Sequence, residues 1–161
     1  MVAELSATWL SPENQRWALT IERSHQRAFG RGLLPGHACA DQTRTRAQSL
    51  FSASEPVLAH NGNQDPTLVY ANAAALLLWR RDWNAMVGMP SRLTAPEQER
   101  AERAQALGSA QTMDAFQGYR GIRIDSTGRR FVIDNARIWT LWDAQGERCG
   151  QAASFARWWW I

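Results

Sequence analysis

Few residues in this sequence could do acid–base or metal chemistry. Asp134 and His60 are candidates for an acid–base pair, and neither has a partner residue nearby in the sequence. No hydroxyl or thiol residue stands beside a base in the pattern of an activated nucleophile, and no two carboxylates share an apolar setting. Cys39 and Cys149 are far apart and have no metal-ligand spacing. The sequence therefore predicts neither a catalytic site nor a metal site.

Polar side chains on apolar strands are a second kind of candidate. The odd-numbered residues of the predicted strand 129–142 share one face, and they include Phe131, Ile133, Asn135, Trp139 and Leu141. An amide among apolar neighbours needs partners, because burying it unpaired costs roughly 1–3 kcal/mol. Asn135 either bonds backbone or water in a filled core, or binds a ligand together with Phe131 and Trp139.

Three further residues are open to the same two interpretations. Gln151 shares one face of the last predicted strand with Phe155, and Tyr119 lies on an earlier strand. Each either makes hydrogen bonds within the protein or binds a ligand. Tyr70 is a weaker ligand candidate, because a structural role suits its position better. Arg123 could neutralise an anion, but we expect it at a solvated strand end.

The elements that would position these residues centre on residues 67–79. Residues 67–70 are rich in β-branched and aromatic types and predict a strand. Residues 73–79 are alanine, leucine and tryptophan and predict a helix. Asn72 stands between them, where its side chain can cap the helix.

The other elements follow from periodicity and turn residues. The predicted strands are 56–60, 67–70, 116–124, 129–142 and 147–158. The predicted helices are 12–29, 41–51, 73–79, 83–87 and a long polar helix after Thr94, its expected cap. The first two strands form a hairpin and the last three a meander. We therefore expect an α+β domain at 55–158, an N-terminal helical extension at 1–54 and an aromatic tail at 159–161.

Composition narrows the class of protein. All 18 basic residues are arginine, which codon bias explains more simply than phosphate recognition. They are scattered among 15 acids and the net charge is +3, so a nucleic-acid-binding surface is disfavoured. The N-terminus does not resemble a signal peptide, no apolar run approaches a membrane span, and two cysteines do not make a disulfide scaffold. These features favour a cytoplasmic protein without membrane contacts.

The order of elements resembles that of a PAS domain, a five-stranded antiparallel sheet with helices over one face. Five segments are similar in sequence to the MEKHLA domain, a PAS-related family: residues 68–76, 90–95, 119–124, 128–131 and 150–155. The resemblance covers roughly residues 15–158. It implies a sensory or dimerisation-control module, found as a stand-alone bacterial protein, without catalytic residues.

The resemblance also bears on cofactors. PAS ligands lie between the inner face of the sheet and the helices, and a glutamine on the last strand of light-sensing relatives orients flavin, which suits Gln151. Covalent flavin chemistry needs a cysteine on the central helices, where neither Cys39 nor Cys149 lies. Haem needs an axial ligand, and His60 is on a strand rather than the long helix. No particular cofactor therefore follows from the sequence.

These observations predict a PAS-like sensory or protein-interaction module that binds a small apolar ligand or none. It would signal through a homodimer or a partner protein, using the helix at 12–29 and the aromatic tail. The alternative is a small α+β cone-fold enzyme with an acid–base pair in an apolar pocket. That alternative requires Asp134 to lie buried opposite a histidine in an open cavity.

Overall fold

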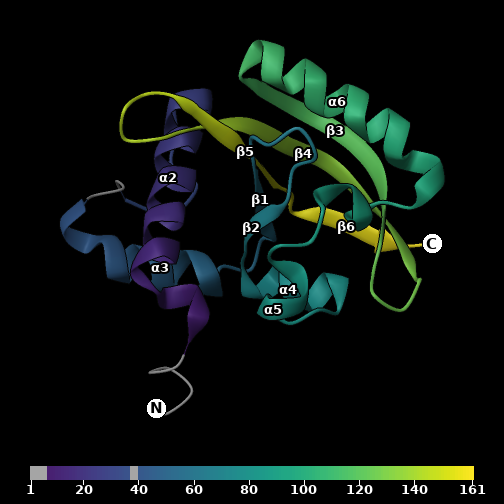
Figure 1. The fold of residues 1–161 in the computed structure, drawn as a ribbon, viewed down its shortest axis with the longest axis horizontal. Helices are drawn as coiled ribbons and strands as arrows, with labels where there is room; N and C mark the ends of the chain where they lie inside the picture. The colour runs from purple at the N-terminus through teal and green to yellow at the C-terminus, as the bar shows by residue number, and fades with distance from the viewer. Residues whose placement is uncertain (1–6, 37–39) are drawn as a thin grey trace.

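The computed structural model describes residues 7–36 and 40–161, and its elements follow the predicted order (Figure 1). The helices are η1 (Thr8–Leu10), α2 (Pro12–Phe29), η2 (Ala40–Gln42), α3 (Thr43–Ser52), α4 (Ala73–Trp79), α5 (Trp83–Met86), η3 (Ser91–Thr94), η4 (Glu97–Glu99) and α6 (Arg100–Met113). The strands are β1 (Val57–Asn61), β2 (Leu68–Ala71), β3 (Ala115–Ile124), β4 (Arg130–Trp142), β5 (Arg148–Ser154) and β6 (Arg157–Trp160). Cys39 lies outside the described residues.

The strands form one antiparallel sheet in the order β2-β1-β5-β4-β3. The predicted hairpin of β1 and β2 and the predicted meander of β3, β4 and β5 are both confirmed. A short sixth strand, β6, pairs with residues 131–134 of β4, while β5 pairs with residues 137–142. β5 and β6 therefore follow one another along the same edge of β4.

Helices cover both faces of this sheet. In Figure 1, α2 and α3 lie on one side of the strands, and α6 lies on the other, over β3. Two groups of buried apolar side chains fill the space. The α6-side core includes Leu58, Trp79, Phe131, Ile133, Ala136, Ile138 and Phe155. The α2-side core includes Ile21, Leu50, Val57, Ala59, Tyr70, Trp139 and Leu141. The predicted PAS-like fold is confirmed, and the N-terminal extension covers the remaining sheet face.

Asn72 joins four segments of the chain. Its Oδ1 accepts from the backbone N–H of Ala75 at 3.1 Å, which confirms the predicted helix cap, and from that of Val57 at 2.9 Å. Its Nδ2 donates to the carbonyls of Leu50 at 3.1 Å and Glu55 at 2.9 Å. Because the side chain is fully buried, all four bonds are shielded from water. This one amide fixes the end of α3 to β1 and to the start of α4.

A β-bulge divides β4 into two halves that face differently. Between Tyr119 and Gly121, β3 advances by two residues, whereas β4 advances by three between Ile133 and Ala136. Asn135 takes up the extra residue with a left-handed backbone, φ 53°, and its side chain is exposed. The prediction that Asn135 faces inward is therefore wrong, because simple alternation ends at the bulge.

The bulge also separates residues that were predicted to lie together. Phe131 and Ile133, before the bulge, belong to the α6-side core. Trp139 and Leu141, after it, belong to the α2-side core. The predicted shared face of the strand at 129–142 therefore holds only for its first half.

Two other sequence predictions change in the structure. Thr94 does not cap the long helix, because it belongs to η3 and its hydroxyl donates to the carbonyl of Ser91 at 2.7 Å. The helix α6 begins at Arg100, after Glu99. Trp159 and Trp160, predicted as a tail, belong to β6, and Trp160 packs against the α6-side core.

Candidate functional site

A small internal cavity lies between the inner face of the sheet and α6. Its volume is about 30 Å³, and we call it the inner cavity. Apolar side chains make most of its wall: Leu58, Trp79, Leu107, Ile133, Ala136, Ile138, Ala153 and Phe155. Its polar lining comes from His60, Thr94, Arg103, Tyr119, Arg123 and Gln151. An apolar wall with a few directed polar groups is typical of small-molecule sites.

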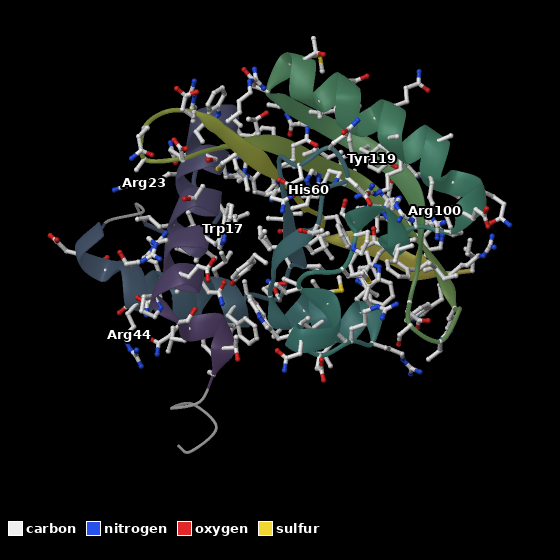
Figure 2. All side chains as sticks on the ribbon, in the orientation of Figure 1. Trp17, Arg23, Arg44, His60, Arg100 and Tyr119 are labelled. Atoms are coloured by element: carbon white, nitrogen blue, oxygen red, sulfur yellow. The ribbon has the colours of Figure 1, made fainter. Side chains whose placement is uncertain are left out.

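An open cleft of about 590 Å³ adjoins the inner cavity. The turn between β1 and β2, the start of η3, the first half of α6 and the adjoining ends of β4 and β5 enclose it. The two spaces share four lining residues, His60, Arg103, Leu107 and Gln151. Figure 2 shows His60, Tyr119 and Arg100 on the α6 side of the sheet, away from Trp17 on α2. A molecule in the cleft would therefore lie against the same polar groups that line the inner cavity.

Two buried arginines face each other across the inner cavity. Arg103 comes from α6 and Arg123 from β3, and they are 7% and 6% exposed. Burial, followed by the charge of Arg123, lowers the pKa of Arg103 to about 10. Among the described residues, no carboxylate forms an ion pair with either guanidinium. The site is therefore positively charged, and no ion pair among the described residues balances the two arginines.

Tyr119 connects Arg123 to the long helix. Its hydroxyl donates to Glu102 at 3.3 Å and accepts from a guanidinium nitrogen of Arg123 at 3.3 Å. The same arginine donates to the carbonyl of Ile122 at 2.8 Å. These bonds hold Arg123 in one orientation. Glu102 contacts Arg123 only indirectly, through the Tyr119 hydroxyl.

Gly121 makes room for that pair. Residues 119, 121 and 123 share one face of β3, so the Tyr119 and Arg123 side chains meet above Gly121. A Cβ at this position would lie 2.3 Å from the Tyr119 hydroxyl and 2.9 Å from a nitrogen of Arg123. The glycine is needed here for close approach rather than for backbone freedom.

His60 presents an unpaired acceptor to the cavity. Its Nδ1 lies 2.8 Å from the carbonyl of Asn61, which can only accept, so Nδ1 carries the proton. Burial lowers the pKa of His60 to about 4, so the ring is neutral at pH 7 and Nε2 is a free lone pair. That Nε2 is buried and has no hydrogen-bond partner among the described residues. Such a group costs free energy unless something binds to it.

Gln151 lies where the sequence placed it, on the inner face of β5 with Ala153, and Phe155 directly after β5 lines the same cavity. Its amide nitrogen donates to the carbonyl of Leu107 at 3.0 Å and so ties β5 to α6. Tyr119 also lines the inner cavity. Phe131 packs against Trp79, a residue of the cavity wall, with ring centroids 5.1 Å apart. The structure thus brings three of the six predicted site residues to the α6 side of the sheet.

Asn135, Trp139 and Tyr70 lie elsewhere. Asn135 is exposed at the bulge. Trp139 is buried on the α2 side and donates its indole N–H to the carbonyl of Ile21 at 3.2 Å. Tyr70 is buried in the same α2-side core, and its hydroxyl has no partner among the described residues. None of the three lines the inner cavity or the cleft.

Arg103 was not among the residues predicted for the site, and Arg123 and His60 were given too little weight. A pattern for Arg103 was present, because Leu107 and Ala110 follow it by four and seven residues, on the same face of the helix. Arg123 has the same parity on its strand as Tyr119. Its predicted exposure to solvent is wrong: Arg123 lies near the end of β3, but its side chain is buried in the inner cavity with Arg103 of α6.

The acid–base pair required by the enzyme alternative does not form. Asp134 lies at the bulge and pairs with Arg120 at 2.8 Å and Arg157 at 3.0 Å, both of which are largely exposed. It lines neither space, whereas His60 lines both. The two residues therefore do not face each other.

The residues of the inner cavity fit neither a covalent flavin site nor a haem site. Cys149 lies on β5 against the α2-side core, so the described part of the cavity contains no thiol. His60 has the free lone pair that an iron would need, but about 30 Å³ cannot hold a macrocycle. Within residues 7–36 and 40–161, no group of three metal-ligating side chains occurs and no helix is long and apolar enough to cross a membrane.

The comparison with protein families agrees with this geometry. The model of the MEKHLA domain matches residues 15–160. The chain belongs to the MEKHLA domain family. Its match includes α2, so most of the N-terminal extension is part of the family's common sequence. No curated protein is similar enough in sequence to be matched.

Solved structures similar to this MEKHLA domain are PAS and light-oxygen-voltage domains. The PAS domain of a protein from Colwellia psychrerythraea superposes with a TM-score of 0.62 at 11% identity, over 70% of this chain and 93% of that chain. An RNA-binding light-oxygen-voltage receptor gives 0.63 at 19% identity, over 78% and 35%. The light-state dimer of the fungal photoreceptor Vivid gives 0.53 at 18% identity, over 66% and 79%. At these identities the likeness shows the fold alone.

Proposed function

We propose that this MEKHLA domain is a sensory module that binds a small molecule between α6 and the sheet and passes the signal to another protein. The observation that carries the proposal is the inner cavity beside an open cleft, with His60, Arg103 and Gln151 lining both. Small-molecule sites typically occupy about 300–1,000 Å³, so the cleft of about 590 Å³ is large enough.

The proposal includes no catalysis. The cavity has basic and neutral polar groups, but among the described residues no carboxylate lines it and no nucleophile is held by a base. The separation of Asp134 from His60 removes the one acid–base pair that the sequence offered. Binding therefore fits the geometry better than turnover does.

We also propose that the signal leaves through contacts with a second copy or a partner protein. The light state of Vivid, a protein of the same fold, is a dimer. On β6, Trp158 and Trp159 are 37% and 39% exposed, and Ile161 after it is 61% exposed. Exposed apolar clusters often mark contact surfaces. The α2 helix has a buried face on the sheet, so only its outer side is free for such contacts.

Native mass spectrometry of freshly purified protein tests the proposal. We expect a retained small molecule and a population of dimer. Ala153→Leu, which places a larger side chain in the inner cavity, should lose the ligand, because the cavity has only about 30 Å³ of space. Ala156→Leu, at an exposed position two residues after Ser154, is the matched control and should keep it. Wild-type protein that is ligand-free and monomeric at every concentration would contradict the proposal.

A further inference from the structure

We propose that the ligand is a small organic carboxylate with a hydroxyl on the adjacent carbon. The carboxylate would bind Arg103 and Arg123, and the hydroxyl would donate to His60 Nε2. This inference rests on the proposed ligand-binding function and specifies its chemistry. It replaces the apolar ligand predicted from the sequence with an anionic one.

The first step is the charge of the site. Arg103 and Arg123 are both more than nine-tenths buried, and the part of the chain that the structure describes supplies no ion-pair partner to either. The groups that face Arg103 across the cavity are Arg123 and Tyr119 from β3, neutral His60 from β1 and Gln151 from β5. Burying like charges without a counterion is costly, and a bound anion would remove that cost.

The cleft has the same sign of charge. Arg92, Arg100, Arg103 and Arg148 line it, and Asp65 is its one acidic lining residue among those described. Arg148 is paired with Asp114 at 2.6 Å, so the excess positive charge of the cleft comes from Arg100 and Arg103. Asp65 is itself paired with Arg92 at 3.3 Å, on the outer rim. A positively charged cleft raises the local concentration of anions and leads them toward the buried pair.

The second step is the shape of the anion. The inner cavity, at about 30 Å³, has room for a group of only a few atoms, while the cleft can hold the rest of the ligand. Guanidinium groups bind planar, two-oxygen anions through paired hydrogen bonds. A carboxylate satisfies both conditions, whereas a phosphate is bulkier and more strongly charged.

The third step is the free acceptor on His60. Nε2 is buried and unpartnered, and its lone pair requires a donor. Because His60 and Arg103 line both the inner cavity and the cleft, one small ligand can contact both. An ammonium donor would lie beside two guanidinium groups and be repelled. A hydroxyl supplies the donor without the charge.

Matched probes of one size test this inference by calorimetry and thermal shift. Mandelate carries both groups, mandelamide lacks the charge, phenylacetate lacks the hydroxyl, and phenylglycine replaces the hydroxyl with an ammonium. Lactate and lactamide repeat the first pair on a smaller skeleton. We expect each acid to bind about tenfold or more tighter than its amide, and mandelate to bind severalfold tighter than phenylacetate and phenylglycine.

Variants at two arginines separate a ligand role from a structural one. Arg103→Gln should abolish the preference for acid over amide and should raise the melting temperature of the ligand-free protein, because an uncompensated buried charge is removed. A structural arginine would lower it. Arg92→Gln removes the same charge from the exposed rim of the cleft and is the control, with binding reduced far less.

The outcomes distinguish this inference from the proposed function. A retained molecule that is neutral or cationic, amides that bind as tightly as acids, or full affinity in Arg103→Gln would overturn the carboxylate assignment and leave a ligand-binding module. A protein that is purified without ligand and is stabilised by none of the probes at millimolar concentration would overturn both.

Discussion

The stability of this fold depends on pH through two buried histidines. His25 is fully buried on α2; its Nδ1 donates to the carbonyl of Arg31 at 3.0 Å and its Nε2 accepts from Arg137 at 3.1 Å. Its hydrogen bonds are therefore satisfied only in the neutral form. Burial is the main cause that lowers the pKa values of both His25 and His60 to about 4. Each ring resists a proton that the unfolded chain accepts near pH 6.5.

Stability should therefore fall between pH 7 and pH 5. The unfolded state binds protons on both histidines in that range while the folded state does not, so the free energy of unfolding decreases as the pH decreases. We expect a loss of about 2 kcal/mol per histidine in urea denaturation at the two pH values. Burial raises the pKa of Glu22, which opposes part of this effect.

A substitution at His60 separates its contribution to the pH dependence of stability from that of His25. His60→Gln replaces the ring with a neutral amide of similar size that cannot take up a proton. The part of the pH dependence that His60 contributes should be lost, while the contributions of His25 and Glu22 remain. An unchanged slope in His60→Gln would show that His60 does not titrate on unfolding.

At the residue scale, the sequence placed Gln151 and Tyr119 on the correct strand faces, but it indicated the charge of the site only through Arg123, which was expected at a solvated strand end. Parity on a strand places a side chain on a face, which suffices for these two. Arg103 and Arg123 line one cavity only because α6 packs over β3, and no local feature of the sequence predicts that packing. The neutrality of His60 likewise depends on its burial beside α6, a helix that lies far from it in the sequence.

The elements themselves were largely predictable. Their turns have local chemistry: Asp125 accepts from the backbone of Thr127 and Arg129, both at 2.9 Å, and Asp143 accepts from that of Gln145 and Glu147, both at 2.9 Å. Such turns end strands whatever the tertiary context. The bulge in β4 is different, because one asparagine with positive φ inside a long strand makes no distinctive pattern.

The backbone at Asn135 yields a prediction about β4. Asn135→Val should destabilise the protein by about 1–2 kcal/mol, because a β-branched residue is strained at φ 53°. Asn135→Gly is the matched control and should be neutral or slightly stabilising, since glycine adopts this conformation freely. Guanidinium denaturation of both variants measures the difference. Equal costs for valine and glycine would mean that the side chain matters more than the backbone.

For the whole molecule, the N-terminal extension is bound closely to the sheet. Trp139 donates to Ile21 at 3.2 Å, and the backbone N–H of Trp142 donates to the hydroxyl of Ser24 at 3.0 Å. Arg137 donates to His25 on α2 at 3.1 Å, and Asn72 bonds the end of α3. The α2-side core is therefore shared between residues before and after position 54.

Deleting residues 1–54 tests whether the predicted core at 55–158 is autonomous. We expect the shortened protein to aggregate or to lack a cooperative thermal transition, because Tyr70, Trp139 and Leu141 would be exposed to water. Ile21→Ala in the full chain is the graded control and should cost about 2–5 kcal/mol while leaving the fold intact. A soluble, cooperatively unfolding fragment would instead establish the extension as a separate unit.

The bulge also affects how members of this family should be compared. It adds one residue to β4, and from Ala136 to Leu141 the side chains of the strand face the opposite side from the one that simple alternation would give. In a relative without that residue, the side chains of this part of β4 that line the cavity here would face α2, and those that face α2 here would line the cavity. Insertions and deletions near position 135 therefore matter more than substitutions there, and an alignment that places the gap one residue away would equate ligand-facing positions with helix-packing ones.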